Sequence, residues 1–164
     1  MNDIPIVKNA KEVFILRGVM GSGKSYTAGR ILKKYPNAVI CSSDSFFVNA
    51  DGEYEYQPGK FGQSHNACRN DFINAIEDGF KKIVIDNTNK QIWEYDLYVN
   101  LAKMFGYRFH IINCNPAPIG EKETLRTMFE RQVHDVPIDV FLRFWWSFED
   151  DPREVAADTV AWLQ

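Results

Sequence analysis

Long apolar runs are missing from this sequence of 164 residues. A membrane-spanning helix needs about 20 consecutive, mostly apolar residues, and no stretch of the chain comes near that length. Residues 1–11 also lack the charged, apolar and small-residue regions of a signal peptide. Internal repeats, low-complexity tracts and linkers are absent as well. We therefore expect no membrane segment and no export signal, and the length predicts one compact domain over residues 1–164.

Cysteine is scarce, and its spacing excludes two classes of site. The chain has three cysteines, Cys41, Cys68 and Cys114, and no Cys-x-x-Cys pair. No spacing of histidine, cysteine and carboxylate residues fits a zinc site. An odd number of widely spaced cysteines is typical of reduced thiols in the cytoplasm. Cys41 and Cys114 each end an apolar run, so we expect both to pack in the core.

An excess of positive charge is also missing, since the formal net charge is −3. A protein that binds many nucleic-acid phosphates usually carries a basic footprint. The charge balance therefore disfavours a protein coated in nucleic acid, although it leaves room for a local basic groove.

Short apolar runs alternate with amphipathic stretches along most of the chain. The apolar runs predict buried strands, and the stretches with helical periodicity predict helices. Strands are expected at 13–16, 38–41, 82–86 and 107–114. Helices are expected at 24–34, 61–77, 91–105 and 153–163, with two more between 121 and 148 that join near 135–137.

This order of elements predicts an α/β fold. Strands that alternate with helices favour a parallel sheet with right-handed crossovers and helices on both faces. We expect a three-layer arrangement around a sheet of about four to five strands. The helical and polar-rich segment at roughly 116–150 is where a mobile lid would lie in such a fold.

Residues 18–25 read Gly-Val-Met-Gly-Ser-Gly-Lys-Ser and match the P-loop pattern G-x-x-x-x-G-K-[ST] in full. A predicted strand precedes this segment and a predicted helix follows it. The glycines allow backbone geometries that a Cβ would forbid, so the loop amides can cradle phosphate oxygens at a helix N-terminus. Lys24 would reach the β- and γ-phosphates, and Ser25 would offer its hydroxyl to Mg²⁺.

The P-loop therefore predicts binding of ATP together with Mg²⁺. The alternatives are a chance glycine-rich turn and a loop that binds nucleotide without chemistry. We assign nucleotide contacts to the loop and the residue that follows it: Gly18, Met20, Gly21, Ser22, Gly23, Lys24, Ser25 and Tyr26.

Two acidic residues follow predicted strands and would share the rim of the sheet with the P-loop, where ligands of parallel sheets bind. Asp44 follows the second strand and could accept a proton from an attacking hydroxyl. It could equally cap a short helix. Asp86 ends the third strand and is similar to the carboxylate that reaches Mg²⁺ in P-loop proteins, with a strand-ending turn as the alternative. We predict Ser25 and Asp86 as the metal ligands.

Three arginines, Arg126, Arg131 and Arg143, lie in the helical segment after the fourth strand. An arginine on a lid can stabilise the charge that phosphoryl transfer spreads over the transferred group. The alternative for each is a solvated helix face. We assign Arg126 to the nucleotide and Arg131 to catalysis, the latter on the family resemblance given below.

Other polar and aromatic side chains offer weaker signals. His65 could contact a ligand or be structural, and His110 is expected to be structural. Tyr95, Tyr98 and the aromatic residues of 144–148 could stack on bases, but core packing is the better interpretation.

Five segments of the chain are similar to one family. They are residues 18–25, Ser-Ser-Asp-Ser-Phe-Phe at 42–47, Asp-Gly-Glu-Tyr at 51–54 with Tyr56, Pro58 and His65, Ile-Asp-Asn-Thr-Asn at 85–89, and Arg-Gln-Val-His at 131–134. Over residues 13–148 the chain resembles the P-loop kinase domain of polynucleotide 5′-hydroxyl kinases, and more closely a group of related small ATP-binding domains of AAA or zeta-toxin type. The segments at 51–54 and 85–89 are more specific than the P-loop.

The resemblance implies a small doubly wound P-loop kinase fold with a helical lid. It implies that Asp44 is the general base and that Arg131 lies near the transferred phosphate. It also implies that Asn87 and Asn89 hold the loop or the substrate in position. The substrate side would then comprise Asp44, His65, Asp86, Asn87, Thr88 and Asn89.

One departure from the polynucleotide kinases concerns the acceptor. Those enzymes place an arginine shortly after the general base, where it contacts the phosphate of the acceptor, whereas here Ser45, Phe46 and Phe47 follow Asp44. We predict an ATP- and Mg²⁺-dependent kinase for a hydroxyl acceptor, with a nucleic-acid 5′-hydroxyl as the first candidate. A nucleoside, nucleotide or small metabolite is the second, and an ATP-binding module with little transfer is the third. The sequence predicts no oligomeric state.

Overall fold

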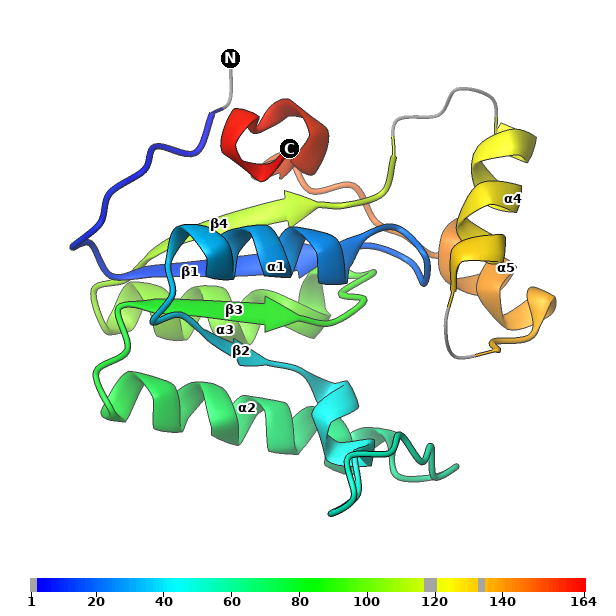
Figure 1. Ribbon diagram of the computed structural model, residues 1–164, viewed down its shortest axis with the longest axis horizontal. Helices are drawn as coiled ribbons and strands as arrows, with labels where there is room; N and C mark the ends of the chain where they lie inside the picture. The colour runs from blue at the N-terminus through cyan, green and yellow to red at the C-terminus, as the bar shows by residue number, and fades with distance from the viewer. Residues whose placement is uncertain (1–2, 117–120, 133–134) are drawn as a thin grey trace.

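In the computed structural model, a parallel sheet lies between two layers of helices (Figure 1). The structure describes residues 3–116, 121–132 and 135–164. Within these ranges the sheet has five strands in the order β2-β3-β1-β4-β5. Every neighbouring pair is parallel, as the periodicity predicts. The strands are β1 Glu12–Arg17, β2 Val39–Cys41, β3 Lys82–Asp86, β4 Arg108–Asn113 and β5 Glu154–Ala156.

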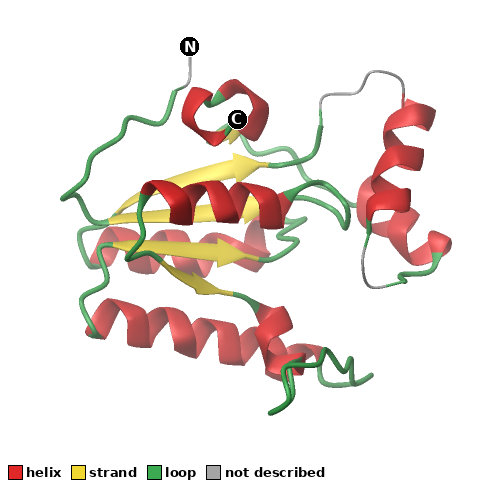
Figure 2. Cartoon of the chain, in the orientation of Figure 1, coloured by secondary structure: helices red, strands yellow, loops and turns green. Residues whose placement is uncertain are grey.

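Helices cover both faces of the sheet (Figure 2). The α-helices are α1 Lys24–Lys34, α2 Phe61–Glu77, α3 Ile92–Met104, α4 Glu121–Arg131 and α5 Ile138–Trp146. Short 3₁₀ helices are η1 Ser43–Phe47, η2 Ala157–Thr159 and η3 Ala161–Leu163. None of the helices in the described ranges is long and apolar enough to cross a bilayer.

The alternation of side chains along β1 builds two cores. Val13 and Ile15 pack with residues of α2 and α3 on one face, while Phe14 and Leu16 pack with α1 and η3 on the other. Successive side chains of a strand point to opposite faces, so one fully buried strand joins both layers. This explains why the strand reads as an unbroken apolar run. Cys41, Cys68 and Cys114 are buried and unpaired, which confirms the expectation of free thiols.

The predicted helix at 153–163 is wrong. This segment forms the edge strand β5, whose Val155 pairs with Ile112 of β4, followed by the two turns η2 and η3. Val155, Thr159 and Val160 are β-branched and lose side-chain freedom in a helix. The free edge of β4 offers backbone hydrogen bonds that local periodicity cannot reveal. The other expected strands and the helices expected at 24–34, 61–77 and 91–105 agree with the structure to within one or two residues. The two helices expected between 121 and 148 are present, and α4 ends at Arg131, before the expected junction.

The pair α4–α5 lies beyond the carboxyl ends of the strands, apart from the two layers (Figure 1). It has its own apolar cluster, in which Met128 and Phe141 are buried together with Val19 of the P-loop. The segment predicted as a lid therefore contacts the phosphate-binding loop directly. Its residues 117–120 and 133–134, which include His134, lie outside the described residues.

Candidate functional site

A cavity of about 1070 Å³ opens at the carboxyl ends of the parallel strands. The P-loop, η1, the end of β3, the start of α2, the α4–α5 pair and the C-terminal turns all contribute side chains to it. In a parallel sheet these strand ends share one rim, so residues far apart in sequence meet there. The cavity brings together Lys24, Asp44, Asp86 and Arg131, which the sequence predicts as functional.

The P-loop is held by hydrogen bonds from two neighbouring strand ends. The Gly18 amide donates to the Thr88 carbonyl oxygen at 3.0 Å, and the Val19 amide donates to Asn115 Oδ1 at 2.9 Å. Gly21 has a φ of 81°, and a Cβ there would lie 1.9 Å from the Met128 carbonyl oxygen. Glycine is therefore needed at this position both for the backbone angle and for the approach of α4.

Lys24 folds back over its own loop. Its Nζ donates to the carbonyl oxygens of Gly18 at 2.9 Å and Val19 at 3.3 Å. Burial lowers the pKa of Lys24, and the negative charges of Asp86 and Asp44 oppose that shift. The ammonium group is thus poorly solvated and partly surrounded by acidic groups, a setting that favours exchange of its carbonyl partners for phosphate oxygens.

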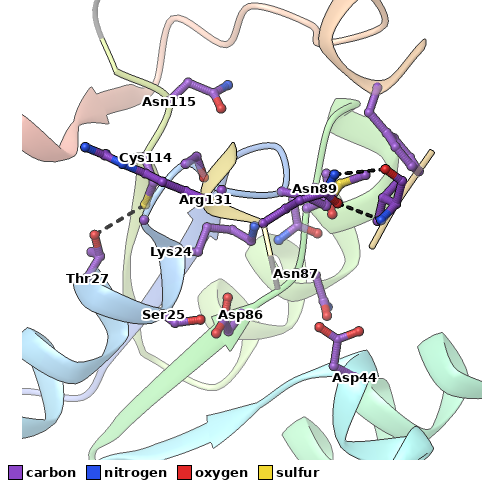
Figure 3. A pocket seen from close by; sticks show the side chains of 18 of the residues that line it. Lys24, Ser25, Thr27, Asp44, Asp86, Asn87, Asn89, Cys114, Asn115 and Arg131 are labelled. Atoms are coloured by element: carbon purple, nitrogen blue, oxygen red, sulfur yellow. Dashed lines mark hydrogen bonds between the residues drawn. The ribbon is translucent and has the colours of Figure 1, made fainter. Parts of the chain in front are cut away.

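Asp86 and Ser25 lie beside each other beneath Lys24 (Figure 3). Burial raises the pKa of the Asp86 carboxyl group, Lys24 opposes this rise and Asp44 adds to it. A carboxylate that is costly to ionise next to a hydroxyl is a donor set that a hard cation would stabilise. In kinase sites Mg²⁺ uses one or two protein oxygens and takes the rest from phosphates and water, so the two side chains fit this ion.

The structure argues against one of the two interpretations of Asp44, the helix cap. The helix η1 is capped by Ser42, whose Oγ accepts a hydrogen bond from the Asp44 amide at 3.2 Å. Asp44 is therefore not the cap. Its carboxylate points into the cavity from the side opposite Arg131 (Figure 3), which leaves it accessible to a ligand.

Asn87 and Asn89 use their side chains to fix the site. Asn87 Oδ1 accepts a hydrogen bond from the Ser43 amide at 2.8 Å, and its Nδ2 donates to Cys68 Sγ at 3.4 Å. Asn89, with a φ of 47°, donates to the Leu16 carbonyl oxygen at 2.8 Å. Both amides are buried. They join the end of β3 to η1 and to the strand before the P-loop, and they still line the cavity with Thr88.

Of the three arginines in the helical segment after β4, only Arg131 is among the described residues that line the cavity. Arg126 forms an exposed ion pair with Glu130 at 2.9 Å, and its position does not support the predicted contact with nucleotide. Arg143 pairs with Asp139 at 3.5 Å, also on an exposed face. Met128 of α4 and Phe141 of α5 pack with Val19, and the way each helix packs determines which of its arginines faces the cavity.

Two aromatic predictions are confirmed, because Tyr95 and Tyr98 are buried in the core. Trp146 differs, since it is 66% exposed. His65 lines the cavity beside the ring of Phe61, at 4.3 Å between centroids. Burial lowers the pKa of His65, against the opposing charges of Glu94 and Asp44.

Sequence reasoning missed Arg17, the last residue of β1. Its buried guanidinium forms an ion pair with Glu154 and donates to the carbonyl oxygens of Asn89, Lys90 and Glu149. It also stacks on the rings of Tyr95 and Phe148. The available signal was a charged residue at the end of an apolar run, directly before Gly18.

Comparison with known proteins agrees with this geometry. Residues 13–144 match the AAA domain family. Human NEDD4-binding protein 2 is 37% identical over 94 residues, which cover 57% of this chain and 5% of that protein. The chain thus spans a small part of that relative.

Solved structures show a similar fold. A fungal RNA kinase superposes with a TM-score of 0.59 and 15% identity, covering 92% of this chain and 74% of that chain. A gluconokinase from Sinorhizobium meliloti 1021 superposes with a TM-score of 0.56 and 17% identity, covering 89% of this chain and 81% of that chain. At these identities the similarity concerns the fold. The chain belongs to the AAA domain family, and its fold is the P-loop kinase-like α/β fold that the sequence resemblance implies.

Proposed function

We propose that this domain transfers the γ-phosphoryl group of ATP to a hydroxyl acceptor, and that the acceptor is the 5′-hydroxyl of a nucleic-acid end. One observation carries the proposal: a complete P-loop and Asp44, a carboxylate that does not cap η1, line the same cavity from different sides. An ATP-binding module would have no need of such a carboxylate.

The proposed roles follow from the positions of the side chains. Asp44 accepts the proton of the acceptor hydroxyl while the hydroxyl oxygen forms a bond to the γ-phosphorus. The bond from that phosphorus to the bridging oxygen breaks, and ADP leaves. Lys24 and Arg131 stabilise the negative charge on the transferred group. Ser25 and Asp86 would hold Mg²⁺, which neutralises phosphate charge when it is bound.

The contact between lid and loop supports transfer over hydrolysis. Met128 and Phe141 are buried in one cluster with Val19 of the P-loop, so α4 and α5 pack against the part of the cavity where the phosphates would bind. Water that is excluded there cannot compete with the acceptor hydroxyl.

The similarity in fold to a fungal RNA kinase supports a nucleic-acid acceptor. The absence of an arginine after Asp44 favours the second candidate, a nucleoside or another small hydroxyl compound, because Phe46 and Phe47 occupy those positions.

The test is transfer from γ-labelled ATP to a panel of acceptors. The panel holds 5′-hydroxyl DNA, 5′-hydroxyl RNA, nucleosides, nucleotides and gluconate, with Lys24→Ala as the inactive control. We expect label on a 5′-hydroxyl end. In Asp44→Asn we expect turnover to fall on the order of 10²–10⁴-fold. If no acceptor gains label above the Lys24→Ala control, the kinase assignment is wrong.

A further inference from the structure

The acceptor side of the cavity is lined by aromatic rings. We call Phe47, Tyr54, Tyr56, Phe61 and His65 the aromatic wall, since all five line the cavity. Phe47 is buried, and the rings of Tyr54 and Tyr56 pack against it at 6.0 and 5.1 Å between centroids. Tyr56 is nevertheless 55% exposed and Phe61 53% exposed. Half-exposed rings that are supported by a buried ring form a surface on which another flat ring can pack.

Backbone hydrogen bonds within the protein hold the aromatic wall in place. The backbone after η1 turns back on itself: the Glu55 amide donates to the Phe47 carbonyl oxygen at 2.7 Å, and the Asn49 amide donates to the Glu53 carbonyl oxygen at 2.9 Å. Val48 and Tyr54 form an antiparallel bridge. Tyr54 and Tyr56 are two residues apart on this extended segment, so both face Phe47. A rigid wall loses little entropy when a ligand binds.

Asp44 is adjacent to this wall. It belongs to the same 3₁₀ helix as Phe47, and its charge helps raise the pKa of Tyr54, which burial already raises. A hydroxyl held at the Asp44 carboxylate would therefore bring the next few atoms of its own molecule against the rings.

The charges around the wall disfavour recognition of the acceptor through an anionic group next to its hydroxyl. Among the described residues that line the cavity, Lys24 and Arg131 are the only lysine and arginine, and both serve the transferred phosphate in the mechanism above. Asp44 and Glu94, which also line the cavity, add negative charge. Arg69, one turn beyond His65, donates to Asn66 Oδ1 at 3.0 Å and does not line the cavity.

We propose that the aromatic wall stacks the terminal nucleobase of the acceptor, so that the site recognises a 5′-hydroxyl by the base beside it and not by a phosphate clamp. This inference rests on the proposed kinase function. Stacking tolerates every base because each has a flat face. The substrate class is then a nucleobase-bearing 5′-hydroxyl, in a nucleic-acid end or a free nucleoside, and sugar acids are excluded.

The experiment compares a short 5′-hydroxyl oligonucleotide with the same oligonucleotide lacking its 5′-terminal base. We expect kcat/KM to fall on the order of 10- to 100-fold without the base, the scale of one base stack. Tyr56→Ala should cause a similar fall with the intact oligonucleotide and little further fall with the abasic one. Tyr56→Phe keeps the ring and should keep the activity. Phe61→Ala, on a separate element, repeats the test should Tyr56→Ala fail to fold.

Phe105→Ala is the matched control, because Phe105 is 49% exposed but follows α3 at the far end of the sheet. It should leave both substrates unchanged. Equal transfer to intact and abasic ends would overturn the stacking inference and leave the kinase function standing, as would transfer to gluconate at the rate for a nucleoside. Efficient transfer to a free nucleoside supports the inference, since the base alone then suffices.

Failure of the kinase function is distinguished by direct binding. If no acceptor gains label, calorimetry with the same two oligonucleotides in the presence of ADP measures how much the terminal base adds to binding affinity, without any transfer reaction. Tighter binding of the intact end, lost in Tyr56→Ala, supports the wall as a base site. Equal binding of the two ends overturns it.

Discussion

The two sides of the cavity are built in different ways. The donor side is the P-loop, held by hydrogen bonds to Thr88 and Asn115 and covered by Met128. The side that we propose for the acceptor is a layer of half-exposed rings beside Asp44, with acidic neighbours and no lysine or arginine of its own among the described lining residues. Phosphate is recognised by convergent backbone amides and a cation, whereas a flat ring is recognised by the apolar surface on which it stacks. The difference teaches that the pattern which identifies the nucleotide says little about the acceptor.

The sharpest way to separate the two sides is to remove one charge from each. Asp44→Asn should lower kcat on the order of 10²–10⁴-fold and leave ATP affinity unchanged, because in the proposed mechanism the carboxylate acts on the acceptor proton. Lys24→Ala should also weaken ATP binding. Titration calorimetry with ATP and single-turnover transfer measure the two effects. Weakened ATP binding in Asp44→Asn would show that the sides are not independent.

The support beneath the P-loop can be tested at Arg17. Arg17→Met removes one partner of a buried ion pair and leaves Glu154 uncompensated, so we expect a loss of about 3–5 kcal/mol of unfolding free energy. Urea denaturation measures it. The control is Arg143→Met, which breaks an exposed i,i+4 pair and should cost at most about 0.5 kcal/mol. Similar values for both variants would contradict a structural role for Arg17.

Adding one methyl group at Gly21 tests the close approach of α4 to the P-loop. Gly21→Ala places a Cβ at a positive φ, which costs about 1–2 kcal/mol, and against the Met128 carbonyl oxygen. We expect lower stability and easier proteolysis of the segment around α4. Gly29→Ala is the matched control, since it lies within α1 with no atom within 4 Å of its Cβ. That variant should be neutral or stabilise the protein by up to about 1 kcal/mol.

The smallest expected effect is on stability as a function of pH. The pKa of Asp86 is raised by burial, so the folded state is favoured where this group is protonated and loses that advantage as pH rises through its folded pKa. Asp86→Asn should therefore be more stable than the natural protein at pH 7, and the difference should vanish below the ordinary value of 3.8. Transfer activity should fall in the same variant. Denaturation at a series of pH values measures the first effect, and a difference independent of pH would refute it.

Much of the fold and of the donor side can be predicted because their signals are local. The apolar run of β1, the loop at 18–25 and the helix after it are contiguous, and strand ends of a parallel sheet share one rim. That geometry also brings Asp44 and Asp86 to the P-loop. The edge strand β5 could not be predicted, because Val155 is in a strand only through its pairing with β4.

The sequence by itself determined the P-loop, the parallel α/β order and the two acidic strand ends, since each depends on neighbours a few residues away. Only the tertiary structure decided that Arg131 and not Arg126 lines the cavity, that Ser42 and not Asp44 caps η1, and that Arg17 links β1 to Glu154. It also assembled the aromatic wall from η1, the turn after it and α2. These choices depend on which face of a helix or turn packs inward, and long-range burial fixes that face.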